Sequence, residues 1–165
     1  MTERIYTAGL VVIGDEILSG RTHDKNIAQI ASWLQVQGIR LSEVRVVPDV
    51  VERIVEAVNT LREAYDYLFT TGGIGPTHDD ITSASIAKAF GVELVRHPDA
   101  LALLVRHFRP EDVNEARLKM ADVPAGATLI ANPVSSAPGY RMGNVFVLAG
   151  VPEIMRAMFD CIRHE

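Results

Sequence analysis

The stretch Thr70-Thr71-Gly72-Gly73-Ile74-Gly75-Pro76-Thr77-His78-Asp79-Asp80-Ile81 decides how this chain is interpreted. The apolar run of residues 67–70 before the glycines is typical of a short buried strand, and residues 81–90 have the pattern of a helix. Glycines between a strand and a helix let a ligand approach backbone N–H groups, and the helix adds the positive end of its dipole. The sequence therefore predicts a cradle for an anionic, phosphate-bearing ligand. Its expected members are Thr71, Gly72, Gly73, Ile74, Gly75, Pro76 and Thr77.

This glycine loop, residues 72–80, differs from the two best-known phosphate-binding loops. It lacks the Gly-Lys-Ser/Thr ending of a P-loop, and its glycines are not spaced as Gly-x-Gly-x-x-Gly. The alternative interpretation is a connecting turn in which Asp80 caps the helix that follows. Three glycines with Pro76, Thr77 and two aspartates exceed what such a cap requires, so we favour the anion cradle.

Strands and helices alternate on both sides of the glycine loop. Continuous or alternating apolar patterns predict strands, while apolar residues at helical spacing predict helices. The expected strands are residues 5–13, 41–47, 67–70, 92–95, 127–130 and 145–148, and the expected helices are residues 26–37, 51–61, 81–90, 98–108, 113–120 and 154–162. This order predicts a three-layer α/β/α fold with a mostly parallel sheet, in a single domain spanning residues 1–165.

Three further segments are expected at strand ends, where ligands of open parallel sheets bind. The segment Gly14-Asp15-Glu16 follows the first strand, Asp49 follows the second, and Gly150 follows the last. Ser135 belongs to a turn rich in small polar residues, which is either a ligand contact or an ordinary loop. We therefore expect these residues to lie close to the glycine loop and to contact the same ligand.

Carboxylates beside an anion cradle would repel a phosphate unless a cation lies between them. Asp79 and Asp80 end the glycine loop, and Asp49 lies at a neighbouring strand end. A hard divalent ion such as Mg²⁺ takes oxygen ligands from one or two carboxylates and from substrate phosphates. Each aspartate alone is equally well explained as a cap or turn residue. As a group they predict a metal site made by Asp49, Asp79 and Asp80.

The composition argues against some partners and compartments. The formal net charge is −5, so no overall positive field attracts nucleic acid or an anionic membrane. No apolar run approaches about 20 residues, the length of a membrane-spanning helix. Cys161 is the only cysteine, which fits a reducing compartment. We therefore expect a cytoplasmic protein whose partner is a small phosphorylated molecule, held by local geometry.

Several motifs together resemble one known family, the molybdopterin-binding MoaB/Mog domain, in the form found at the N-terminus of CinA-type proteins. The resemblance covers nearly the whole chain in order. It is carried by Gly14-Asp15-Glu16-Ile17-Leu18-Ser19-Gly20, by residues 71–82, by Asn114-Glu115-x-Arg117, and by residues 122–127 with Asn132. The chain departs from the family pattern at Ser135, where a glycine is usual, and at Asp79, where adenylyltransferases carry an arginine.

The resemblance implies a function and candidate catalytic residues. In adenylyltransferases of this family the residues that match Asp49 and Asp80 are the key acids. They take part in transfer of AMP from Mg²⁺-ATP to the phosphate of molybdopterin, in molybdenum cofactor biosynthesis. CinA-type proteins are associated instead with metal-dependent hydrolysis of ADP-ribose-type pyrophosphates, and a non-catalytic binding module is the third possibility. The resemblance thus implies Mg²⁺ or another divalent cation as cofactor, molybdopterin or a nucleotide as ligand, and a homo-oligomer, a trimer in Mog proteins.

Overall fold

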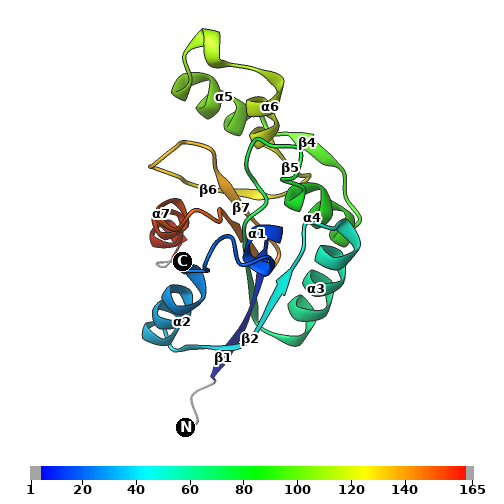
Figure 1. The fold of residues 1–165 in the computed structure, drawn as a ribbon, viewed down its shortest axis with the longest axis vertical. Helices are drawn as coiled ribbons and strands as arrows, with labels where there is room; N and C mark the ends of the chain where they lie inside the picture. The colour runs from blue at the N-terminus through cyan, green and yellow to red at the C-terminus, as the bar shows by residue number, and fades with distance from the viewer. Residues whose placement is uncertain (1–4, 163–165) are drawn as a thin grey trace.

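A computed structural model describes residues 5–162 of the chain, and it has the predicted three-layer α/β/α architecture (Figure 1). The central sheet has six strands in the order β2-β1-β3-β8-β7-β6. Four of them are mutually parallel, and β7 and β6 extend the sheet as antiparallel neighbours of β8. The strands are β1 (Tyr6–Ile13), β2 (Ile39–Val47), β3 (Tyr67–Thr71), β6 (Thr128–Ile130), β7 (Gly139–Met142) and β8 (Val145–Leu148).

Four helices cover the two faces of this sheet (Figure 1). On one face α2 (Asn26–Val36) and α7 (Pro152–Ile162) bury a cluster that includes Leu34 and Phe159. On the other face α3 (Val51–Ala64) and α4 (Thr82–Phe90) bury a second cluster that includes Leu61. Each fully buried side chain of this size contributes about 1.5–3 kcal/mol, so the two clusters fix the strand ends on which the functional residues stand.

A small lobe, residues 94–124, lies beyond the carboxyl ends of the strands (Figure 1). It contains α5 (Pro98–His107), the single-turn α6 (Glu115–Leu118), the 3-10 turns η1 (Pro110–Asp112) and η2 (Lys119–Ala121), and a two-stranded sheet of β4 (Leu94–Arg96) and β5 (Asp122–Pro124). Its apolar cluster is small and centres on Leu104. Arg96 ties the lobe together, because its guanidinium donates to Glu115 at 2.7 Å and to Asp122 at 2.9 Å.

The structure corrects several boundaries that the sequence predicts. Residues 113–120 are not one helix, because the Asn114 side chain accepts the Arg117 N–H at 2.9 Å and starts α6 only at Glu115, one turn before η2. The strand expected over 92–95 becomes β4, which pairs with β5 outside the main sheet. Strands β5 and β7 and the four-residue helix α1 (Asp15–Leu18) were not expected. Within residues 5–162 no helix is both long and apolar enough to cross a membrane.

Candidate functional site

The glycine loop is held by three neighbouring elements at its first residues. The Gly72 N–H donates to Leu148 of β8 at 3.1 Å, and the Thr82 hydroxyl donates to the Gly72 carbonyl at 2.9 Å. Gly72 has a φ of +96°, and a Cβ atom there would overlap the carbonyl oxygen of Ile13. A Cβ on Gly150 would in turn come within 3.0 Å of the Gly72 Cα. Two glycines are therefore needed where β1, β3 and β8 end side by side.

The N–H groups of the loop are divided between the loop itself and the space beside it. Thr77 donates its N–H to Asp80 at 2.9 Å, and Gly72 donates to β8, so these two amides are already used. Gly73, Ile74 and Gly75 donate to no acceptor in the described part of the chain. These three consecutive N–H groups are the ones that remain for the anion cradle that the sequence predicts.

Asp80 closes the glycine loop and does not cap α4. Its carboxylate accepts both the N–H of Thr77 at 2.9 Å and the hydroxyl of Thr77 at 2.8 Å. Helix α4 begins at Thr82, and Ile81 precedes it without a side-chain cap. The alternative interpretation of Asp80 as a helix cap is therefore wrong.

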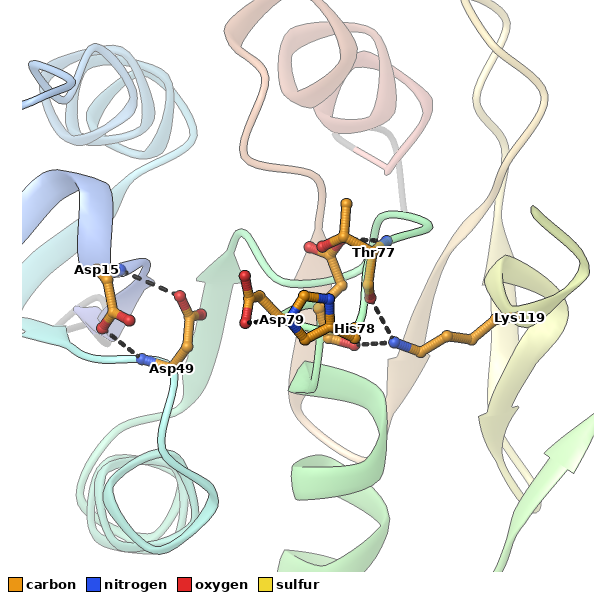
Figure 2. Close-up of polar contacts among 7 residues, drawn as sticks. Asp15, Asp49, Thr77, His78, Asp79 and Lys119 are labelled. Atoms are coloured by element: carbon orange, nitrogen blue, oxygen red, sulfur yellow. Dashed lines mark hydrogen bonds and ion pairs between the residues drawn. The ribbon is translucent and has the colours of Figure 1, made fainter. Parts of the chain in front are cut away.

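Lys119 of the lobe also contacts the glycine loop, and the sequence does not predict this contact. Its Nζ donates to the carbonyl oxygens of Thr77 and Asp80, each at 2.7 Å (Figure 2). These two bonds link the lobe directly to the glycine loop.

Asp15 and Asp49, at the ends of β1 and β2, are joined by two reciprocal hydrogen bonds (Figure 2). The Asp15 N–H donates to the Asp49 carboxylate at 3.1 Å, and the Asp49 N–H donates to the Asp15 carboxylate at 3.0 Å. Burial raises the pKa of Asp49 above its ordinary value, the bond from Asp15 opposes this, and repulsion by Asp15, Glu16 and Asp79 adds to it. Asp49 is therefore a carboxylate whose affinity for a proton is increased.

An acidic pocket of about 210 Å³ lies between this pair and the glycine loop. Asp49, Asp79 and Asp80 all line it, as the sequence predicts, together with Asp15 and Glu16. Among residues 5–162, however, no three acidic, histidine or cysteine side chains are close enough together to hold a metal ion. The donors are hard oxygens, which suit Mg²⁺, but the site fits that ion only if a ligand phosphate and water complete the coordination.

A main pocket of about 720 Å³ lies on the other side of the loop. Gly73, Glu16 and Asp80 line both pockets, so the two cavities meet at the loop. The lobe contributes Phe108 and Arg117 to the main pocket, and these two residues were not among the predicted site residues. A volume of this size is typical of pockets for small organic ligands.

The segment with Asn132 and Ser135 forms another wall of the main pocket. Asn132 is buried, and its amide group donates to the Ser135 hydroxyl at 2.6 Å and to Ala137 at 2.8 Å. Its carbonyl oxygen accepts the N–H groups of Val134 and Ser135. Asn132 therefore uses its hydrogen-bonding groups to shape its own loop, and Ser135 presents the polar surface there.

The structure brings most of the predicted site residues together. The main pocket includes Glu16, Gly72, Gly73, Ile74, Gly75, Pro76, Asp80, Ser135 and Gly150, and the acidic pocket includes Asp15, Glu16, Asp49, Gly73, Thr77, Asp79 and Asp80. Gly14 and Thr71 line neither pocket, because both are buried under the loop at the ends of β1 and β3. Their role as ligand contacts stays a prediction.

Comparison with known proteins agrees with this geometry. A protein from Pyrobaculum calidifontis is 41% identical over 93% of this chain, and a CinA-like protein from Desulfosudis oleivorans is 36% identical over 93%. The chain spans 61% of the first of these proteins and 38% of the second. The crystal structure of CinA, of unknown function, from Thermoplasma acidophilum is 36% identical with a TM-score of 0.91, covering 96% of both chains.

The fold extends to more distant proteins. The tungsten cofactor synthesizing protein MoaB from Pyrococcus furiosus has a TM-score of 0.63 at 21% identity, covering 99% of this chain and 94% of its own. The family described as the probable molybdopterin binding domain matches residues 9–164. The chain therefore belongs to this MoaB/Mog-type family, in its CinA-like branch.

Proposed function

We propose that this protein is a metal-dependent hydrolase that cleaves the phosphoanhydride bond of a nucleotide-type pyrophosphate. The observation that carries the proposal is the pair of unequal pockets that meet at Gly73 of the glycine loop, whose N–H group and those of Ile74 and Gly75 have no acceptor among the described residues. The main pocket has room for one organic ligand, and the acidic pocket of about 210 Å³ has room for a metal ion and water. Hydrolysis needs no second organic substrate.

The residues of the loop and strand ends divide the work of this reaction. A phosphate of the ligand is bound by the N–H groups of Gly73, Ile74 and Gly75. Asp80 would supply a carboxylate oxygen to Mg²⁺, with phosphate oxygens of the ligand and water completing the coordination, and the ion when bound would neutralise phosphate charge and polarise the attacked phosphorus. The Asp49 carboxylate takes a proton from the attacking water, which its raised pKa favours. The water oxygen bonds to phosphorus, the bridging P–O bond breaks, and two phosphate monoesters leave.

A second candidate function is binding of a phosphorylated pterin, with adenylyl transfer to it. The description of the matching family favours this candidate, because it names molybdopterin as the ligand. The pterin would occupy the main pocket with its phosphate on the glycine loop. The acidic pocket is too small to hold a second nucleotide beside it, which is why hydrolysis is the function that the geometry supports better.

A substrate panel separates the two candidates. The protein is incubated with nucleoside diphosphate esters, or with ATP and a phosphorylated pterin, in Mg²⁺, Mn²⁺ or Co²⁺, and phosphorus NMR identifies the products. We expect metal-dependent release of two phosphate monoesters, abolished by EDTA and by Asp49→Asn. Formation of an adenylated pterin with release of pyrophosphate would instead establish the second candidate. Tight binding of either ligand without turnover would identify a non-catalytic binding module and contradict the proposal.

A further inference from the structure

We propose that Arg117 of the lobe is a specificity-determining residue that binds the second phosphate of the ligand, the one released as the leaving group. This inference rests on the proposed function. It assigns a role to the lobe that neither the fold nor the acidic residues require.

Arg117 is singled out by the charges around the main pocket. Among the described residues that line this pocket, it is the only lysine, arginine or histidine, while Glu16 and Asp80 bring negative charge. The three N–H groups of the glycine loop have room for one phosphate. A second linked phosphate therefore needs another partner in the same pocket, and the guanidinium of Arg117 is the group with the required charge.

The Arg117 side chain is positioned by two contacts, and some of its N–H donors have no acceptor among the described residues. Its Nη1 donates to the Asp112 carbonyl at 2.6 Å, and its guanidinium carbon lies 4.8 Å from the centre of the Phe108 ring. The Asp112 carboxylate is 3.8 Å from the same Nη1. Within residues 5–162, Nε and Nη2 donate to no acceptor, and 37% of the side chain is exposed. Two donors of a guanidinium fork therefore remain for a phosphate, the geometry in which arginine binds that group best.

Lys119 anchors the segment that carries Arg117 to the glycine loop. The two residues are separated by one position in the segment from α6 into η2, and Lys119 holds the carbonyls of Thr77 and Asp80. Lys119 also lies on the side of the glycine loop opposite to Asp49 (Figure 2). Arg117 itself lines the main pocket and not the acidic pocket, so it can meet the leaving phosphate, which acquires negative charge when the bridging bond breaks.

The test measures binding without turnover, by calorimetry with Mg²⁺. The probes are α,β-methylene-ADP, which carries two linked phosphates, and AMP, which carries one. For Arg117→Gln we expect affinity for α,β-methylene-ADP to fall by about 10- to 100-fold, as for loss of a charged hydrogen-bonded pair, and affinity for AMP to change less than about threefold. Arg117→Lys keeps the charge but loses the fork, so its affinity should lie between those of the other two proteins.

Arg141→Gln is the matched control. Arg141 also stacks on a phenylalanine, 5.0 Å from the Phe146 ring centre, and donates to a backbone carbonyl, but it lies outside the main pocket. Its replacement should leave both affinities unchanged. A loss with Arg117→Gln that is equal for the two probes would show that Arg117 only supports the lobe, and it would overturn the inference. So would unchanged binding of α,β-methylene-ADP.

Failure of this inference differs from failure of the proposed function. If the wild-type protein cleaves pyrophosphates and Arg117→Gln cleaves them with the same KM and kcat, the Arg117 assignment is wrong and the hydrolase proposal stands. If Arg117→Gln selectively loses α,β-methylene-ADP but the wild type cleaves nothing, the Arg117 assignment stands and the hydrolase proposal is wrong.

Discussion

On the acidic side of the glycine loop the functional groups come from the ends of parallel strands, whereas on the lobe side they come from short segments with a small core of their own. Asp15 and Asp49 follow β1 and β2, which pair along most of their length. Arg117 and Lys119 stand on a single helical turn and a 3-10 turn. The strand-end side holds the acids that repel one another, with Arg21 beside them, and the lobe side holds Arg117 and Lys119.

The difference teaches where each kind of residue can be placed. Mutually repelling carboxylates stay together only if the backbone forces them to, and the buried sheet supplies that force. The cations of the lobe are attracted to the loop or to a ligand, so they need less support from the fold. If the two sides differ in this way, substitutions on the acidic side should change the reaction and substitutions on the lobe side should change ligand binding.

The largest effect is expected from Asp49→Asn on the acidic side. The substitution removes the base of the proposed reaction, so kcat should fall by about 100- to 10,000-fold in a steady-state assay. Asparagine still accepts the Asp15 N–H, so folding should be retained. Because the pKa of Asp49 is raised, its protonated form is favoured in the folded protein, and ionisation at neutral pH costs stability. Asp49→Asn should therefore be at least as stable as the wild type at pH 7.

The pH profile checks the same residue independently. The rate should fall as pH decreases through the raised pKa of Asp49, at a higher pH than an ordinary aspartate with a pKa of 3.8 would give. The residual activity of Asp49→Asn should lack this decrease. A decrease that persists in the variant would assign the base to another group.

Gly72→Ala tests the support beneath both sides. A Cβ would overlap the carbonyl oxygen of Ile13 and would occupy a φ of +96°, so the free energy of unfolding should decrease by at least about 2 kcal/mol. Gly38→Ala is the control, because Gly38 has a φ of +79° but nothing within 4 Å of a new Cβ. It should cost only about 1 kcal/mol. Equal losses in urea denaturation would show that the close approach of β1 and the loop is not tight.

Asp80→Asn should have a smaller effect, and it should act on the affinity for the metal ion. The amide keeps an acceptor for the Thr77 N–H but removes a charge from the acidic pocket. We expect the apparent affinity for Mg²⁺ to fall by about tenfold, with the melting temperature little changed. Asp79→Asn is the comparison, since 73% of that side chain is exposed and its ion pair is with His78. If Asp80→Asn unfolds the protein or leaves the Mg²⁺ dependence intact, Asp80 acts only by closing the loop.

Lys119→Met should have the smallest effect on ligand affinity, because it acts indirectly by loosening the glycine loop. Losing both bonds to the carbonyls of Thr77 and Asp80 frees the loop, and ligand affinity should fall by about three- to tenfold. Hydrogen exchange of residues 73–77 should become faster. Lys88→Met, an exposed lysine on α4, should change neither quantity. Unchanged exchange in Lys119→Met would mean that the lobe and the loop are independent.

The two sides also differ in how far the sequence predicts them. Asp49 follows β2 and the glycine loop follows the buried strand β3, and parallel strands bring their carboxyl ends together, so their meeting is predictable. Arg117 and Phe108 reach the main pocket through a chain path that no periodicity specifies. The motif Asn114-Glu115-x-Arg117 is part of the family resemblance, but the resemblance gives Arg117 no role in the site. The predicted trimer stays a prediction.

Tertiary contacts explain the errors within the fold. The strand β7 begins with Gly139 and is too short to show a pattern, and it forms because it pairs with β8 across a tight turn at Gly143. Thr71, which the sequence predicts as a ligand contact, lies where β3 pairs with β8 and is buried there. Sequence spacing places a residue along the chain, whereas pairing decides whether it is covered.

Lys119 binds carbonyl oxygens, which every residue carries, and so it does not depend on which side chains stand at positions 77–80. The side chains of His78 and Asp79 are 93% and 73% exposed and add no contact to this clamp. Mutations at these two positions can therefore accumulate without disturbing the backbone frame. In evolutionary terms the tip of the loop is a permissive position, where single substitutions can exchange one chemistry for another. A combinatorial library at positions 78 and 79 would retain folded members for selection of new activities.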